Sequence, residues 1–183
     1  MAAVIVAAAM WAAPAANADV VTSAVSGGAL SVTTAGATLS AVTLNGTTQS
    51  STGTAATWTL TDSRGTGAAW TVTVTATVPT SAAGTVETTA RTIPVANLTA
   101  STDAVTAGTG ADLTTNITGS SNLVMATTSQ TLLASTGDSK GSYTLAPSFA
   151  LSIPANAYRS NYSDVVGSSA LNPYSSTLTY TIA

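Results

Sequence analysis

The chain has no cysteine and no histidine, and only 6% of its 183 residues are charged. Without cysteine, the fold has no disulfides and no thiolate metal ligands. Without histidine, it lacks the side chain that most often acts as a general base near neutral pH. The seven carboxylates are scattered singly, with no motif of a glycosidase pair or a calcium loop. We therefore expect a non-enzymatic protein with no cofactor and no bound metal.

The scarcity of charge also excludes classes of partner. Ordinary soluble domains contain about 25% charged residues. This chain has four basic residues, spread singly, and a net charge of −3. No basic patch is available for a phosphate backbone, so nucleic acid is not an expected partner. The 37 threonines favour strands over helices, because a β-branched side chain suits a pleated surface that faces water.

The longest apolar run lies at the start of the chain. Residues 2–13 are all apolar, Pro14 follows them, and Ala16 and Ala18 frame a small-x-small cleavage site. This pattern predicts a signal peptide over residues 1–18, although no Lys or Arg precedes the run; a short core helix is the alternative. No later run could span a bilayer, so we expect a secreted protein without a transmembrane anchor. Residues 19–183 have the length of one domain.

Alternation of apolar and polar residues predicts strands. In residues 70–78 an apolar residue at every second position alternates with threonine, and Pro79 ends the pattern. Residues 143–153 keep one apolar parity around Pro147, which predicts an edge strand or a strand bent at a bulge. The last ten residues also keep one apolar parity, and we expect them to be docked on a sheet. Shorter candidates are residues 30–34, 38–44, 88–98, 113–117, 123–127 and 130–134.

One three-residue pattern occurs three times, as Trp58-Thr59-Leu60, Trp70-Thr71-Val72 and Tyr180-Thr181-Ile182. In a strand, each copy places an aromatic and an aliphatic side chain on one face and a threonine on the other. The first two copies flank the loop Asp62-Ser63-Arg64-Gly65-Thr66-Gly67, and the third lies in the terminal stretch that starts at Tyr174.

These residues resemble the WxL domain, a surface module of Gram-positive bacteria. The first motif of that family is Trp-x-Leu followed by Asp-Ser-Arg-Gly-Thr-Gly and a second Trp, as here over residues 57–74. The distant second motif, Tyr-x-x-x-Leu-Thr-Trp-x-Leu, is similar to residues 174–182, where Tyr180 replaces the family's Trp and Ile182 its Leu. The resemblance implies non-covalent binding to peptidoglycan and association with WxL-interacting surface proteins. The motif residues, which are candidates for wall binding, are Trp58, Leu60, Asp62, Arg64, Trp70, Tyr174, Leu178, Tyr180 and Ile182.

The roles of the motif residues stay open at this point. The tryptophans can pack in a core or form an exposed platform for sugars. Asp62 and Arg64 can close a turn in which Gly65 and Gly67 have positive φ, or Arg64 can bind a carboxylate of a wall polymer. The polar loop of residues 160–172 is a further candidate for partner contact.

Together the patterns predict an all-β fold, an antiparallel β-sandwich of the Ig-like or a related type, as one domain after a signal peptide. We expect a secreted protein of the Gram-positive cell wall. Two alternative functions are a structural subunit or adhesin of a surface fibre, which low charge and high Thr and Ala content favour, and a carbohydrate-binding module.

Overall fold

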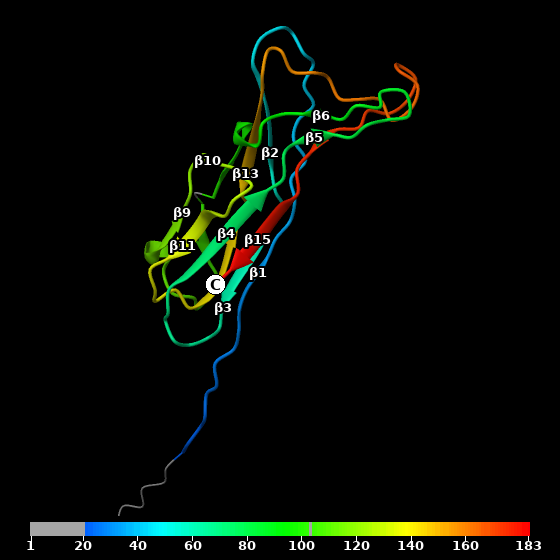
Figure 1. Cartoon of the computed structure of the whole chain (residues 1–183). Helices are drawn as coiled ribbons and strands as arrows, with labels where there is room; N and C mark the ends of the chain where they lie inside the picture. Colours follow the sequence, from blue (N-terminus) through cyan, green and yellow to red (C-terminus); the bar gives the residue numbers. More distant parts are fainter. Residues whose placement is uncertain (1–20, 103) are drawn as a thin grey trace, which may run out of the picture.

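The protein is built from antiparallel β-strands (Figure 1), as shown by a computed structural model that describes residues 21–102 and 104–183. The helical content of these residues is two 3₁₀ turns, η1 (Val95–Asn97) and η2 (Thr114–Asn116). None of their helices is long and apolar enough to cross a membrane. The predicted all-β class is confirmed, whereas the expected signal peptide lies outside the described residues.

Three sheets have four strands each, and a small sheet has three. The first has the order β1 (Leu30–Thr33), β3 (Trp58–Asp62), β12 (Gly141–Leu145), β8 (Thr106–Ala107). The second has the order β10 (Leu123–Val124), β7 (Leu98–Ser101), β13 (Ser148–Ile153), β2 (Gln49–Thr54). The third has the order β15 (Leu178–Ile182), β4 (Trp70–Ala76), β11 (Gln130–Ser135), β9 (Ile117–Gly119). The small sheet has the order β14 (Tyr174–Ser175), β5 (Thr80–Ser81), β6 (Arg91–Thr92).

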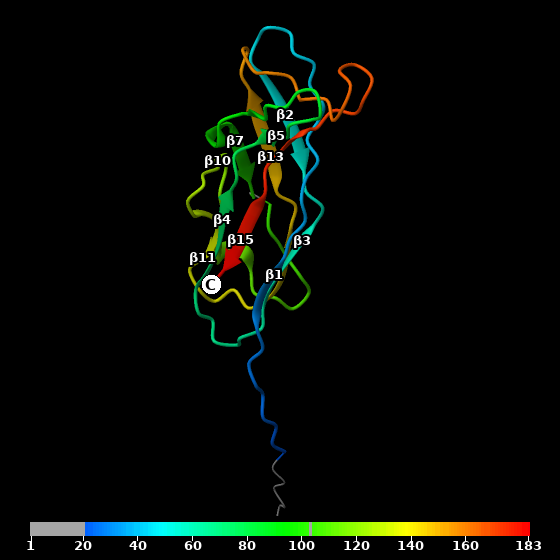
Figure 2. The same ribbon diagram turned by 45° about the vertical axis from the view of Figure 1, so that its right-hand side comes forward.

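The sheets form two layers, with the core between them. Figure 2 shows the sheet of β15, β4 and β11 lying across from β3, β2 and β13 of the other two large sheets. The buried apolar side chains of the three large sheets form one cluster. In β4 the alternation predicted from the sequence is confirmed, because Trp70, Val72 and Val74 are at most 2% exposed and the threonines between them face away from the core.

The C-terminal strand is docked, as expected. β15 pairs with β4 along its whole length, from Leu178 opposite Ala76 to Ile182 opposite Val72. Beyond the strand, Ala183 exchanges two backbone hydrogen bonds with Thr71, of 2.7 and 3.0 Å. β15 is the edge strand of its sheet.

The single strand predicted over residues 143–153 is wrong. Residues 141–145 form β12 and residues 148–153 form β13, and these strands belong to different sheets, where each has a neighbour on both sides. Pro147 lies between them. Because proline cannot donate to a ladder, the chain leaves one sheet at this point and enters the other, and the apolar parity continues across the break.

The shorter candidates had mixed outcomes. Residues 30–34 and 130–134 correspond to β1 and β11. Residues 38–44 are not a strand, since Ser40 supplies their only backbone–backbone hydrogen bond to β2 among the described residues, to the Thr52 carbonyl at 2.9 Å. Residues 88–98 contain only the two-residue β6 before η1, because Pro94 interrupts them.

Two further candidates are shorter than expected, and one strand was not expected at all. Residues 113–117 are mostly η2, and residues 123–127 contain only the two-residue β10. The strand β2 has the sequence Gln-Ser-Ser-Thr-Gly-Thr, which offers no apolar alternation. Its pairing with β13 therefore arises from tertiary context and not from a local pattern.

Candidate functional site

The two stretches that carry the motif meet in the core. Trp58 begins β3, and its ring packs edge-on against Tyr180 of β15 with 4.6 Å between ring centroids and 75° between planes. Trp70 begins β4, the hydrogen-bonded neighbour of β15. Trp58, Leu60 and Trp70 are at most 2% exposed, so the exposed tryptophan platform is wrong for these side chains. Their burial confirms the core alternative.

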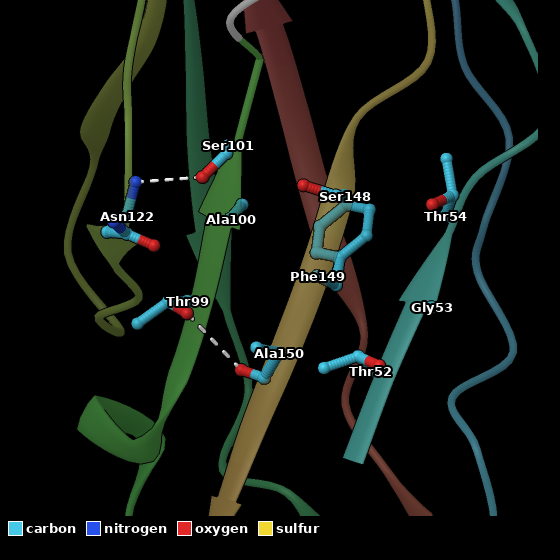
Figure 3. Close-up of a pocket in the computed structure, with 10 residues that line it drawn as sticks. All are labelled: Thr52, Gly53, Thr54, Thr99, Ala100, Ser101, Asn122, Ser148, Phe149 and Ala150. Carbon is cyan, nitrogen blue, oxygen red and sulfur yellow. Dashed lines mark hydrogen bonds between the residues drawn. The ribbon is translucent and has the colours of Figure 1, made fainter. Parts of the chain in front are cut away.

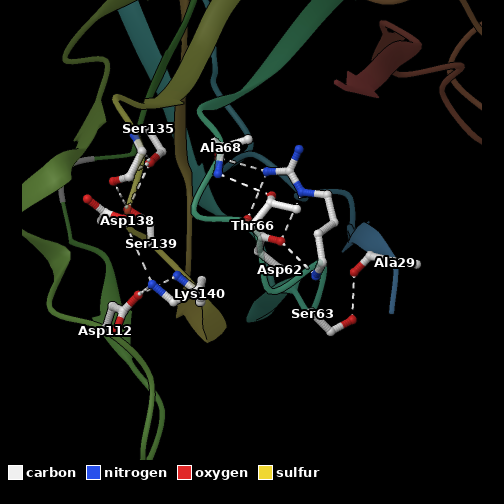
Figure 4. Close-up of polar contacts among 12 residues, drawn as sticks. Ala29, Asp62, Ser63, Thr66, Ala68, Asp112, Ser135, Asp138, Ser139 and Lys140 are labelled. Carbon is white, nitrogen blue, oxygen red and sulfur yellow. Dashed lines mark hydrogen bonds and ion pairs between the residues drawn. The ribbon is translucent and has the colours of Figure 1, made fainter. Parts of the chain in front are cut away.

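The turn after β3 is closed by Asp62 and Arg64 (Figure 4). The Arg64 side chain donates to both Asp62 oxygens at 3.0 and 2.8 Å and to the Ala68 carbonyl at 2.8 Å. The side-chain hydrogen bond from Arg64 lowers the pKa of Asp62, against the effect of burial. Gly65 and Gly67 have φ of 72° and 66°, as the turn alternative required. The Asp62 side chain is 1% exposed and that of Arg64 is 25% exposed, so the ion pair is buried on the side of the carboxylate.

A second polar cluster lies on neighbouring loops (Figure 4). Lys140 Nζ lies 2.8 Å from Asp112 and 3.9 Å from Asp138, and its side-chain hydrogen bond lowers the pKa of Asp112. These side chains are more exposed than Asp62, at 37% for Asp112 and 84% for Asp138. The described residues contain no cluster of three or more carboxylates that could hold a metal ion.

An open groove of about 1180 Å³ runs along one side of the sandwich. One wall is residues 34–44, and the other is the terminal segment with Tyr174, Leu178 and Tyr180. The floor is made of core side chains, among them Ile93 and Phe149. The groove was not predicted from the sequence, because it depends on which segment lies opposite β15.

The motif residues help to build this groove. Trp58 Nε1–H donates to the Ala35 carbonyl at 2.9 Å and so fastens the start of the wall of residues 34–44. Further along the same wall, Ser51 Oγ–H donates to the Ser40 carbonyl. A side chain at Gly53 would collide with the Thr38 carbonyl, so the wall lies directly against β2. Leu178 and Tyr180, which are half-buried, line the opposite wall.

At one end of the groove lies a cluster that we call the tyrosine–arginine rim, made of Arg91, Tyr158, Arg159 and Tyr162. The Arg91 guanidinium lies 4.1 Å from the centre of the Tyr158 ring, which is 64% exposed. The Arg159 guanidinium lies 4.7 Å from the centre of the Tyr162 ring. Arg91 forms no ion pair with any carboxylate of residues 21–102 and 104–183. Its charge is therefore available to a ligand.

Buried polar contacts hold the rim in place. Arg159 makes a bidentate ion pair with Glu87, at 2.7 and 2.9 Å, which lowers the pKa of Glu87. Asn161 is 1% exposed and donates to the carbonyls of Ala82 and Thr89. A side chain at Gly84 would collide with the Tyr162 carbonyl, so the loops of residues 82–90 and 160–172 are in direct contact. Figure 1 shows them projecting together at the end opposite the turn between β3 and β4.

A smaller depression of about 210 Å³ lies over β2, β13 and β7 (Figure 3). Its lining consists of threonines, serines and small residues together with Asn122 and Phe149. Two hydrogen bonds that involve side chains join residues of its lining, from the Asn122 N–H to Ser101 Oγ at 2.8 Å and from the Thr99 hydroxyl to the Ala150 carbonyl at 3.4 Å. It contains no ionisable group, and the rim is therefore the stronger candidate for ligand binding.

Comparison with known proteins gives no match, either to a protein-family model, to a curated protein or to a solved structure. The similarity of the motifs to WxL domains therefore stays a prediction. Of the candidate residues, the structure brings Trp58, Trp70 and Tyr180 together in the core. Figure 1 shows the turn between β3 and β4, which contains Arg64, at the end opposite the projecting loops of residues 82–90 and 160–172.

Proposed function

We propose that the protein is a non-enzymatic, exported surface protein that binds the peptidoglycan of a Gram-positive cell wall without covalent attachment. Support for the WxL resemblance comes from the contact between its two motifs. Stretches that are far apart in the sequence pack as one unit, through Trp58 against Tyr180 and through the pairing of β4 with β15. Association with WxL-interacting surface proteins is part of the same proposal.

The observation that carries the proposal is the exposed Tyr158 ring stacked on Arg91. One face of the ring is occupied by the guanidinium, and the exposed remainder of the side chain offers an apolar surface to a sugar. Peptidoglycan combines sugar rings with carboxylates, and Arg91 can pair with one of these because it forms no ion pair with a described carboxylate. The motif tryptophans act indirectly, by supporting the fold.

Sedimentation with purified peptidoglycan tests the proposal. The wild-type protein is expected to sediment with the polymer, and Tyr158→Ala and Arg91→Ala are each expected to reduce the bound fraction. Leu113→Ala is the matched control, since this side chain is 74% exposed and lies outside the rim and the groove. Circular dichroism should show all three variants folded. Failure of the wild-type protein to sediment, or equal binding by all variants, would contradict the proposal.

The alternative function is a carbohydrate-binding module for neutral glycans. The two functions can be distinguished by the polymer that the protein binds. If Arg91 recognises a carboxylate, peptidoglycan should be bound more tightly than chitin, which carries similar sugars without stem peptides. Equal binding to both polymers would favour the carbohydrate-binding module.

A further inference from the structure

We propose that copies of this protein join head to tail, with the N-terminal arm of one copy paired as an extra strand along β15 of the next. The N-terminal arm is defined here as residues 21–26. This goes beyond the proposed function and does not depend on it. It rests on three observations, namely an unpaired strand edge, an apolar groove beside that edge, and an exposed extended segment of the same chain.

The unpaired edge belongs to β15. The backbone of Thr177 bonds to Thr77, just after β4, and that of Ala183 bonds to Thr71 of β4. In an antiparallel ladder every second residue faces the same neighbour. The N–H and C=O groups of Leu178 and Tyr180 therefore point away from β4, and no described residue bonds to them. Such an edge is a template for strand addition.

The groove lies next to the unpaired backbone groups of β15. Leu178 and Tyr180 line it, and its apolar floor would receive alternate side chains of an added strand. Small-molecule pockets usually measure about 300–1,000 Å³, so a volume of about 1180 Å³ suits an extended peptide. The edge supplies backbone hydrogen bonds and the groove supplies burial, which are the two parts of strand-addition sites.

The N-terminal arm is suited to this place. Its residues are exposed, lie outside any strand and make no hydrogen bond to a described residue. Val21 and Val25 are 97% and 95% exposed, and in a strand both would lie on one face. Six extended residues span ~20 Å, about the length of the five-residue β15. The arm has no charged residue that would oppose burial.

The position of the arm favours a neighbouring copy over its own groove. Gly28 N–H donates to the Ser63 carbonyl at 2.7 Å, which fixes the base of the arm beside the turn after β3. Figures 1 and 2 show the arm leading away from the sandwich at the end opposite the rim. The lining of the groove reaches Tyr158 and Arg159 of the rim, at the end opposite the arm. A contact between the arm of one copy and the groove of the next is heterologous, and such a contact repeats into an open fibre.

Sedimentation velocity over a range of concentrations tests the inference. The wild-type protein should associate beyond a dimer, and the double variant Val21→Asp with Val25→Asp should weaken association by more than ~10-fold, because two charges would have to enter an apolar groove. Leu113→Asp with Val124→Asp is the matched control, since both side chains are at least half exposed elsewhere. A monomeric wild-type protein, or equal association of the arm variant, would overturn the inference.

Disulfide cross-linking between introduced cysteines can identify the partner surface, because the chain has no natural cysteine that would compete. Proteins with Val21→Cys or Val25→Cys are mixed with Ala41→Cys, which lies in the groove wall, under mild oxidation. A disulfide-linked pair of the two different variants is expected, with Val165→Cys in place of Ala41→Cys as the control that does not link. Links only between two arms would overturn the groove as the binding surface. The arm variant should still sediment with peptidoglycan, which separates this inference from the proposed function.

Discussion

Trp58 and Trp70 are both buried, but replacing them by phenylalanine should change the hydrogen-bond contribution to stability in opposite directions. Trp58 and Trp70 are 1% and 2% exposed, and each begins a strand of the core. Their indole N–H groups differ. That of Trp58 donates to the Ala35 carbonyl at 2.9 Å, whereas that of Trp70 is buried without a hydrogen-bond partner among the described residues.

The expected difference follows from these contacts. Both substitutions remove a similar volume, so the packing loss largely cancels in the comparison. Trp58→Phe also removes a hydrogen bond worth ~0.5–1.5 kcal/mol, whereas Trp70→Phe removes an unsatisfied donor whose burial costs ~1–3 kcal/mol. The free energy of unfolding should therefore be lower in Trp58→Phe than in Trp70→Phe by roughly 2–4 kcal/mol.

Urea unfolding followed by far-ultraviolet circular dichroism measures this difference without depending on the fluorophore that is replaced. For a domain of this size, 1 kcal/mol corresponds to ~2–4 °C in Tm, so thermal unfolding should separate the variants by roughly 5–15 °C. Equal stabilities, or a less stable Trp70→Phe variant, would refute the reasoning from the hydrogen bonds.

Other changes to the chain also have expected outcomes. Arg64→Ala should lower Tm more than Lys140→Ala does, because Arg64 is the partner of the buried Asp62, whereas Asp112 is 37% exposed; equal shifts would contradict this. Burial raises the pKa of Tyr180 above its usual range, so its contribution to stability is intact below pH ~10 and is lost as the pH rises further; Tyr180→Phe should resist alkaline unfolding better than the wild type. Deleting residues 177–183 should abolish cooperative unfolding, since it strips β15 from β4. Gly84→Ala should weaken peptidoglycan binding by displacing the loop of residues 160–172, with Gly36→Ala, where a Cβ meets nothing, as the control.

For acid unfolding, the pH dependence of stability runs in the opposite direction from that expected for Tyr180. The hydrogen bond from Arg64 lowers the pKa of Asp62, so this contribution to stability is present above pH ~4 and is lost as the pH falls below it. Asp62→Asn should therefore be less stable than the wild type near pH 7, with a smaller loss of stability in acid. An unchanged acid limb in thermal unfolding from pH 5 to 2 would count against the buried ion pair.

The sequence predicted the parts of the fold that carry a local pattern. β4 alternates strictly between apolar residues and threonine, and the terminal strand keeps one parity, so both were located. The strand β2 has no such pattern, and its place depends on β13, which only the folded chain supplies. Around Pro147 the parity was visible, but parity cannot tell one bent strand from two strands in different sheets.

The candidate site was less accessible to sequence reasoning. The motif indicated that Trp58, Trp70 and the Asp62–Arg64 turn are important, and the structure gives them supporting roles in the core and in a turn. Arg91 and Tyr158 are far apart in the sequence and lie in no motif, so their stacking depends on contact between strand β6 and the loop that carries Tyr158. The groove likewise depends on the path of residues 34–44, within which residues 38–44 were predicted to be a strand and are not one.

The most direct test of wall binding at the rim is a nuclear magnetic resonance titration of the isotopically labelled protein with soluble peptidoglycan fragments. Wall binding at the rim should give chemical-shift changes that saturate with fragment concentration and centre on Arg91, Tyr158 and Arg159, with little change at the turn of Asp62 and Arg64. The absence of saturable changes, or changes confined to that turn, would contradict it.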